Sequence, residues 1–442
     1  MAREPRSRAP RARDTRSQDS RSRDARSRES RANDSPQRQS REATESGVPS
    51  VELPKELSIA LGAGHPWVYR ERLPRGVLAN RATWVHVRAG GFRGYALYDP
   101  VSPIALRMFS REKLPDAAWF RRRVEDALAL RVPYRAAKTS AFRLLNGEGD
   151  GVPGLVADVY DRFVVLATYA GAVSELVLPP IVSAIESLLE PHGVVERVRV
   201  AKEAETEAVG PRRLRLVSGR EPPRRLIVSE SDMKLVANLY EGQKTGLFLD
   251  HRENRAFVRS LSAERRVLNL FSYTGAFSIA AALGGASHVT SVDIAADANA
   301  AARENFELNG LDPEQHEFVS RDVFDYAEAA KTEKRRFDLV ICDPPSFANS
   351  RDQLWGALRA YVRVNALGLA TTAPGGFYAA ASCTAQVSPP AFREALAEAA
   401  ARSNVRFQIV HEAGQALDHP CAAGHPEGRY LKFIVGRVLP RV

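Results

Sequence analysis

The chain has 442 residues, of which 44% are hydrophobic, and a formal net charge of +10. This length predicts roughly three domains with packed cores, and no apolar run approaches the ~20 residues of a membrane helix. The three cysteines all lie in the last quarter of the chain, which argues against a disulfide framework. No histidine is spaced from cysteines or carboxylates as in a metal site. These features exclude membrane and disulfide-stapled secreted proteins, and we expect a metal-free, cytoplasmic protein.

Residues 1–50 have a composition unlike the rest of the chain. They contain thirteen arginines, no lysine and eight acidic residues, a net charge of +5. Because they nearly lack apolar side chains, burial cannot offset the entropy lost on ordering them. We expect a disordered Arg/Ser-rich tail, and either a solvated extension or an electrostatic tether to RNA phosphates fits it. A transit peptide fits less well, since those are poor in acids.

Short alternating strands follow the tail. Trp84–Arg88, Gly94–Tyr98 and Ile104–Phe109 are separated by glycine and proline, a pattern typical of a small β barrel, which we place at 51–122. Trp67 precedes these strands, and both core packing and RNA contact are open for it.

The next region, 123–230, predicts a middle α/β domain. A basic amphipathic helix over Leu114–Leu130 leads into it, and Arg121–Arg123 on that helix are either solvated or in contact with phosphates. Phe142–Gly154 is rich in glycine and predicts turns. The elements expected after it are strands Leu155–Tyr160 and Phe163–Tyr169, helix Leu176–Leu189, strand Val194–Val200 and a hairpin over Leu226–Leu239.

The most informative stretch, Val267–Phe277, reads Val-Leu-Asn-Leu-Phe-Ser-Tyr-Thr-Gly-Ala-Phe. A buried strand breaks into a small-residue loop, a helix over Ala276–Leu283 follows, and a second strand ends on Asp293. In such a βαβ unit the loop brings backbone N–H groups to a ligand at a helix N-terminus, and the carboxylate binds a ribose. Dinucleotide enzymes prefer G-x-G-x-x-G, whereas one glycine suits S-adenosylmethionine. The loop alone does not decide between the two cofactors.

Two later strands favour a methyltransferase. The strand predicted within Phe337–Phe347 ends at Asp343-Pro-Pro. A second strand begins at Gly376 and places Cys383 at the same edge of a doubly wound sheet. A cofactor loop, a rigid acid and a thiol on one rim suit methylation of carbon 5 of a pyrimidine. Cys342 precedes Asp343, so we expect it to point to the opposite face of the sheet and to serve packing.

From Gly64 to Val438 the chain resembles the bacterial 23S rRNA cytosine-C5 methyltransferases of the large-subunit methyltransferase I type. The matching stretches are Gly64-His-Pro-Trp67, Asp232-Met-Lys234, Gly242-Gln-Lys-Thr-Gly246 with Leu249-Asp250, Asn269–Gly275, Ser291-Val-Asp293, Asp322-Val-Phe324, Asp343–Phe347, Ser382-Cys383, Asp418-His-Pro420 and Pro426–Lys432. The resemblance implies a PUA domain, a middle α/β domain and, over 231–442, a class I Rossmann-like methyltransferase domain that binds S-adenosylmethionine. It also implies 23S rRNA or a large-subunit precursor as partner. A homodimer is one arrangement we consider.

The cofactor site is expected at Asn269, Phe271, Ser272, Gly275, Asp293, Asp322 and Asp343. A strand-end cap is the alternative for Asp293, and a helix N-cap is the alternative for Asp322. Lys244, Thr245 and Asp250 contact the methionine end or the RNA, or only make local turn hydrogen bonds.

The predicted catalytic residues are Cys383, as nucleophile, and Asp343, which can hydrogen-bond the N3 edge of a cytosine. Phe347 either stacks on the base or packs in the core, and RNA contact is expected at Trp67, Lys244 and Phe347. Related cytosine methyltransferases have a cysteine where this chain has Pro345, so the base that removes the C5 proton is unassigned. Two other functions are kept open: N-methylation of a guanine or adenine, which needs no thiol, and a non-catalytic RNA-binding factor for ribosome assembly.

Overall fold

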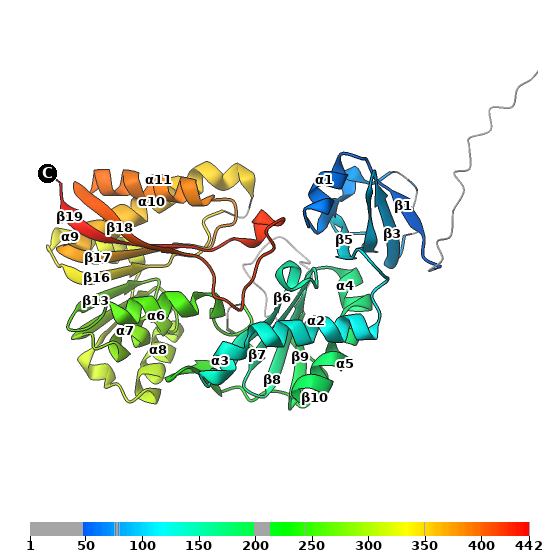
Figure 1. The fold of residues 1–442 in the computed structure, drawn as a ribbon. Helices are drawn as coiled ribbons and strands as arrows, with labels where there is room; N and C mark the ends of the chain where they lie inside the picture. The colour runs from blue at the N-terminus through cyan, green and yellow to red at the C-terminus, as the bar shows by residue number, and fades with distance from the viewer. Residues whose placement is uncertain are drawn as a thin grey trace, which may run out of the picture. The chain divides into compact units, whose positions relative to one another are not determined.

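The computed structural model describes residues 47–442 except 75, 77, 79, 199–212, 243, 349 and 442. Residues 1–46 of the expected tail therefore lie outside the described residues. Within the described residues the strands form three larger sheets and one separate hairpin (Figure 1). No helix among these residues has the length and apolarity to cross a membrane.

The first sheet is the five-stranded one near the N-terminus, with strand order β1-β3-β4-β5-β2. Its elements are β1 (Ser50–Glu52), α1 (Leu57–Gly62), β2 (Trp67–Tyr69), β3 (Thr83–Ala89), β4 (Phe92–Tyr98) and β5 (Ile104–Ser110). The three strands predicted from alternation correspond to β3, β4 and β5. Ser50, expected to end the tail, instead opens β1 and pairs with His86 of β3.

The second sheet has the order β10-β9-β8-β7-β6. Its elements are α2 (Ala117–Leu130), α3 (Val132–Ala136), β6 (Ala141–Asn146), β7 (Leu155–Tyr160), β8 (Phe163–Thr168), α4 (Gly171–Leu176), α5 (Leu178–Leu189), β9 (Gly193–Val198) and β10 (Arg213–Gly219). In the β7–β8 turn, Asp161 has a φ of 55°, which suits a two-residue hairpin loop.

Two predictions for this region were wrong or incomplete, and one strand was not predicted. Strand β6 occupies part of Phe142–Gly154, where turns were predicted, and β10 was not predicted. The helix predicted at Leu176–Leu189 is two helices, α4 and α5, because prolines occupy the first turn of α5 and favour a new helix start there. The predicted strand Val194–Val200 corresponds to β9, and its last two residues lie outside the described residues.

Helix α2 crosses residue 122, where the sequence places a domain boundary. Its buried residues Phe120, Val124 and Ala127 pack in the core of the second sheet. On its outer side, Arg121 pairs with Glu125 and Arg122 with Asp126, both at 3.0 Å. We therefore propose that the middle domain begins at α2, whose arginines form a solvated, self-paired face.

The third sheet has seven strands in the order β15-β14-β13-β16-β17-β19-β18. Before it come the hairpin strands β11 (Leu226–Glu230) and β12 (Met233–Ala237) and helix α6 (Arg252–Ser260). Its elements are β13 (Arg266–Leu270), α7 (Ala276–Leu283), β14 (His288–Asp293), α8 (Ala296–Leu308), β15 (Glu317–Ser320), α9 (Val323–Thr332), β16 (Phe337–Cys342), α10 (Leu354–Thr371), β17 (Thr372–Ser382), α11 (Pro389–Arg402), β18 (Val405–Ala413) and β19 (Lys432–Pro440). Strand β19 is antiparallel to both its neighbours, and the remaining pairings are parallel.

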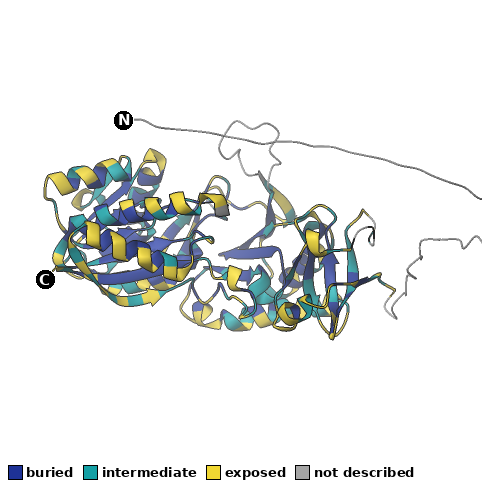
Figure 2. Cartoon of the chain, turned by 90° about the horizontal axis from the view of Figure 1, so that it is seen from above, coloured by how far each residue is buried: buried dark blue, intermediate teal, exposed yellow. Residues whose placement is uncertain are grey.

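Helices cover both faces of this sheet, and the strands between them are buried (Figure 2). Val267 and Ile341 face the core shared with α6, α7 and α8, whereas their neighbours Leu268 and Val340 face the core shared with α9, α10 and α11. Both faces of the strands are apolar because both are covered, as in parallel sheets generally. The predicted doubly wound α/β fold is confirmed.

Candidate active site

The third sheet collects predicted site residues at one edge. Gly275 follows β13, Asp293 ends β14, Asp322 follows β15, Asp343 follows β16 and Cys383 follows β17. These strands are parallel, so their carboxyl ends lie on the same side. The order of the strands reverses between β13 and β16, which is the place where open α/β sheets bind ligands.

The loop between β13 and α7 has a backbone that only certain residues can adopt. Phe271, Tyr273 and Gly275 have φ values of 60°, 48° and 80°. A Cβ at Gly275 would lie 2.9 Å from the Cβ of Ala302, closer than real contacts allow. Glycine is therefore required here, and the tight loop presents backbone N–H groups at the N-terminus of α7, a suitable place for a carboxylate or ribose.

Asp293 and Asp322 both bond to backbone in the described structure. Asp293 accepts hydrogen bonds from the N–H groups of Tyr273 (2.9 Å) and Ala295 (3.0 Å). Oδ1 of Asp322 accepts from the N–H groups of Phe324 (2.8 Å) and Asp325 (3.2 Å), so Asp322 caps α9. An ionised carboxylate has about four lone-pair sites, so these capping roles leave acceptor capacity for a ligand.

Asn269 and Ser272 differ in their hydrogen bonding. Asn269 is buried and donates to Oγ of Ser278 (2.9 Å), which bonds Oγ of Ser291 (2.7 Å). This chain ties β13 to α7 and β14, so it supports the loop from behind. Oγ of Ser272 is buried and has no hydrogen-bond partner among the described residues. A buried hydroxyl without a partner is costly, and it fits a loop built to hold a polar ligand such as S-adenosylmethionine.

Asp343 acts on the Cys383 thiol, as their shared edge predicts. Burial raises the pKa of the Cys383 thiol, and the Asp343 carboxylate raises it further, while Lys244 and Lys432 act in the opposite direction. Cys342, in contrast, is fully buried in the core, and burial raises the pKa of its thiol to about 12. Its predicted packing role is confirmed, whereas Cys383 follows β17 at the edge where Asp343 lies and is only partly buried.

His251 is a neighbour of Asp343 that the sequence did not reveal. Its Nε2 lies 3.3 Å from Oδ2 of Asp343, and its Nδ1 accepts a hydrogen bond from Nδ2 of Asn254 (3.0 Å). With Nδ1 accepting, the proton of a neutral ring is on Nε2 and points to the carboxylate. The ring is only 3% exposed. The motif at Leu249-Asp250 stops one residue short of it, and no spacing connects His251 with β16.

Lys244 and Asp250 form a polar cluster on the rim. Nζ of Lys244 lies 2.5 Å from Oδ2 of Asp250, which also accepts from the hydroxyl of Tyr430 (2.6 Å). Burial alone would raise the pKa of Asp250, but Lys244, His251 and His419 together outweigh it and hold that pKa well below its usual range. Thr245 bonds elsewhere, to the middle sheet: its hydroxyl donates to Oδ2 of Asp158 (2.5 Å).

Three aromatic side chains predicted in the site or in RNA contact already have packing partners. The Trp67 indole donates to Oε1 of Glu148 (2.9 Å), and its ring lies 4.3 Å from that of His425. Phe347 meets the ring of Tyr361 edge-on at 4.9 Å. Phe271 meets Phe324 in the same way at 6.4 Å. All three side chains are half-buried, so each keeps an accessible part beside its packing contact.

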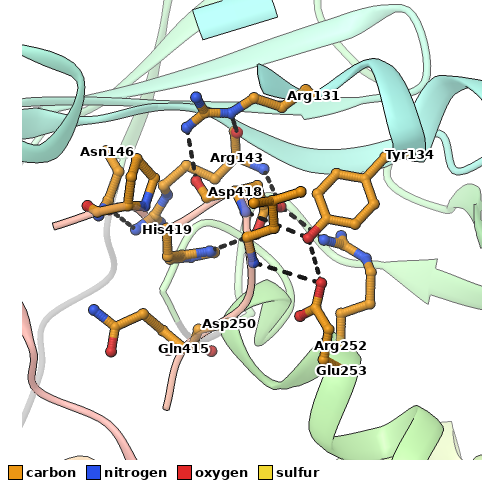
Figure 3. Close-up of polar contacts among 12 residues, drawn as sticks. Arg131, Tyr134, Arg143, Asn146, Asp250, Arg252, Glu253, Gln415, Asp418 and His419 are labelled. Carbon is orange, nitrogen blue, oxygen red and sulfur yellow. Dashed lines mark hydrogen bonds and ion pairs between the residues drawn. The ribbon is translucent and has the colours of Figure 1, made fainter. Parts of the chain in front are cut away.

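A buried ionic cluster lies behind the site, where the loop between β18 and β19 meets α6 and the second sheet (Figure 3). The Asp418 carboxylate contacts Nη1 of Arg252 (2.7 Å), Nδ1 of His419 (2.7 Å) and the backbone N–H of Arg143 (2.9 Å). Arg131 donates to the backbone carbonyl of Asp418 (2.8 Å) and pairs with Asp150. The matching Asp418-His-Pro420 stretch is therefore a structural clamp.

Comparisons with known proteins agree with this geometry. The model of an S-adenosylmethionine-dependent methyltransferase family matches residues 214–424, and the model of a PUA-like domain matches residues 51–111. A candidate S-adenosylmethionine-dependent methyltransferase from Streptococcus mutans has a similar structure, with a TM-score of 0.76 and 26% identity, covering 88% of this chain and 100% of that one. A candidate methyltransferase solved in complex with S-adenosylhomocysteine (SAH) has a TM-score of 0.77 at the same identity and coverage.

The fold, the cofactor loop and these matches define a Rossmann-like methyltransferase that depends on S-adenosylmethionine. The chain is 35% identical over 406 residues to the ribosomal RNA large subunit methyltransferase I of Klebsiella pneumoniae, covering 90% of this chain and 100% of that protein. It is 37% identical over 387 residues to the protein of the same name from Serratia proteamaculans, covering 85% and 96%. The chain belongs to the large-subunit rRNA methyltransferase I family.

Proposed function

We propose that this enzyme methylates carbon 5 of a cytosine in the large-subunit ribosomal RNA, with Cys383 as nucleophile. The relatives named above supply the substrate class. The observation that carries the finer assignment is the partly exposed Cys383 thiol at the carboxyl edge of the sheet, where the Asp343 carboxylate that His251 contacts acts on it. Methylation of an exocyclic or ring nitrogen has no use for that thiol.

The chemistry follows from what each group can do. Asp343, which keeps its contact with His251, takes up a proton from solvent before the reaction. The Sγ of Cys383 then adds to C6 of the cytosine, and Asp343 supplies this proton to N3. The ring becomes an enamine whose C5 is nucleophilic. Bound S-adenosylmethionine supplies the electrophilic methyl group, and Asp293, Ser272 and the backbone of the loop ending at Gly275 would hold it. Asp343 then takes back the N3 proton, the C5 proton is removed, and the C6–Sγ bond breaks.

A groove of about 1270 Å³ is lined by side chains from all three sheet regions. Its lining includes Lys244 and Tyr430, which contact Asp250, and also Arg107 and Arg143. A wide groove with cations and aromatic rings suits a single-stranded RNA segment, from which one base is turned toward the cofactor. We propose that the RNA enters through this groove.

The test is the identity of the product. Large-subunit ribosomal RNA from cells without the gene is incubated with the enzyme and S-adenosylmethionine, digested to nucleosides and examined by mass spectrometry. We expect 5-methylcytidine with wild-type enzyme and none with Cys383→Ala. A methylated guanosine or adenosine, formed equally by both proteins, would favour nitrogen methylation. A protein that binds the cofactor but forms no product would be an assembly factor.

A further inference from the structure

Lys432 is a buried lysine whose burial is not explained by an ion pair. It opens β19 directly opposite Ser382 of β17, the residue before Cys383. Its side chain lies in the interior, 4% exposed. Nζ donates to the backbone carbonyls of Thr384 (2.6 Å) and Tyr430 (2.8 Å), and in the described part of the chain it pairs with no carboxylate. Lysines are seldom buried this way unless they are paired.

The hydrogen bonds of Lys432 suit a neutral amine as well as an ammonium group. An ammonium group has three N–H donors, whereas a neutral amine has two and one lone pair. The two carbonyls use two positions of Nζ, and the third has no partner among the described residues. Burial lowers the pKa of Lys432 to about 8, and the neighbouring Cys383 thiolate pushes it upward. About a tenth of the side chain is then neutral at pH 7, since one pH unit is a tenfold ratio.

The proposed cytosine reaction needs a base in this place. A thiol and a methyl donor cannot occupy the same face of a pyrimidine, so they act from opposite faces. After methyl transfer the C5 hydrogen lies on the face to which Cys383 is bonded. The group that removes this hydrogen must therefore lie on the thiol's side, away from the cofactor loop.

Other groups around the thiol are less suitable. The carboxyl group of Asp343 is already bonded to His251 and, in the proposed reaction, to N3 of the cytosine. Asp250 is held by Lys244 and Tyr430, and its strongly lowered pKa makes it a weak base. Cys342 is fully buried in the core that the sheet shares with α9, α10 and α11. Tyr361 and Tyr430 also interact with the thiol, but burial raises the pKa of both hydroxyls and so keeps them protonated. Two amines act on Cys383, and Lys244 is paired with Asp250 at 2.5 Å. Lys432 is therefore the amine near the thiol that has no carboxylate partner among the described residues.

We propose, resting on the function proposed above, that neutral Lys432 removes the C5 proton and so completes the reaction. In the reactive form Lys432 is a neutral amine and Cys383 a thiol, because burial lowers the pKa of the first and raises that of the second. As Sγ adds to C6, Nζ takes the thiol proton and passes it to solvent. Nζ then takes the C5 proton, the C5–H electrons form the C5–C6 double bond, and Sγ leaves as thiolate. The proton on Nζ returns to Sγ, which restores the thiol and the neutral amine, and one proton is released per methyl group transferred.

The test is a covalent intermediate trapped on ordinary cytosine. Lys432→Gln and Lys432→Arg are incubated with unmethylated large-subunit ribosomal RNA and S-adenosylmethionine carrying a labelled methyl group. Arginine keeps donors and charge but does not lose its proton. In both variants we expect turnover to fall by about 10²–10⁴-fold, the usual contribution of a general base. Labelled methyl should remain on an RNA–protein adduct that survives denaturation.

Controls separate this role from others. Lys331→Gln, a change of an exposed lysine on α9 that pairs with Glu328, should turn over normally and leave no adduct. The double variant Cys383→Ala/Lys432→Gln should form no adduct. If the Lys432 variants transfer no methyl and form no adduct, although they bind the cofactor normally, Lys432 activates the thiol or only supports the fold, and the proposal is overturned. Failure of the wild-type enzyme to make 5-methylcytidine would overturn the proposed function instead.

Discussion

Replacing Asp418 by asparagine tests whether the ionic cluster behind the site holds the molecule together. The substitution keeps the shape of the side chain and removes its charge. Asp418 is 0% exposed and contacts Arg252, His419 and the N–H of Arg143. Breaking a buried ion pair costs about 3–5 kcal/mol. Arg252 keeps a second carboxylate, Glu230, at 3.5 Å, so we expect a loss near the lower end, about 3 kcal/mol.

The measurement is the free energy of unfolding in urea, with Asp232→Asn as the matched control. Asp232 makes two bonds to Arg259 at 2.7 and 2.8 Å, but its side chain is 63% exposed. Exposed ion pairs contribute about 0–1 kcal/mol, so the control should change little. Equal losses in the two variants, or an unchanged unfolding curve for Asp418→Asn, would refute the reasoning.

The difference in unfolding free energy between the wild type and Asp418→Asn should change with pH in one direction only. Burial alone would raise the pKa of Asp418, but the bonds from His419 and Arg252 outweigh it and lower that pKa well below its ordinary value. A carboxylate of this kind stabilises the fold fully above its unfolded pKa of about 4. The advantage of the wild type over Asp418→Asn should therefore be constant near pH 7. It should shrink as the pH falls below about 4 and vanish as the folded pKa is approached.

Three further predictions concern the cofactor and the tail. Asp293→Ala should weaken S-adenosylmethionine binding by about 1.5–3 kcal/mol, the range for hydrogen bonds to charged groups, and an unchanged calorimetric affinity with normal melting would remove Asp293 from the site. Gly275→Ala should abolish cofactor binding and leave the folding of the other two sheets nearly unchanged, because its Cβ would lie 2.9 Å from Ala302 in a backbone with φ of 80°. Normal cofactor binding by this variant would show that the loop adapts. Removing residues 1–46 should leave melting and cofactor affinity unchanged while flattening the salt dependence of RNA affinity; a melting temperature several degrees lower would show that the tail is structural.

The sequence predicted the third sheet well because its signals are local. Apolar strands, a glycine loop and Asp343-Pro-Pro each determine their own conformation, and parallel topology brings their ends together. The helix at Ala276–Leu283 was predicted with the residues it has in the structure. Strand β6 was missed because Phe142–Leu145 is followed by a run of glycines that dominated the interpretation.

Contacts between distant segments were beyond reach of the sequence. His251 meets Asp343 across more than ninety positions, and Lys432 reaches Thr384 only because β19 returns antiparallel beside β17. Neither contact leaves a periodic or spaced pattern in the chain. The clamp around Asp418 has the same character, since its partners come from three separate segments (Figure 3).

The most direct test of the central claim uses RNA that carries 5-fluorocytosine in place of cytosine. Fluorine at C5 cannot leave as a proton, so a thiol that has added to C6 stays bonded to the ring. We predict that wild-type enzyme with S-adenosylmethionine forms an RNA–protein band that survives denaturation. Peptide mapping should locate the bond at Cys383, and Cys383→Ala should form no band. Full methylation of natural RNA by Cys383→Ala, or a wild-type enzyme that forms no adduct, would contradict the account.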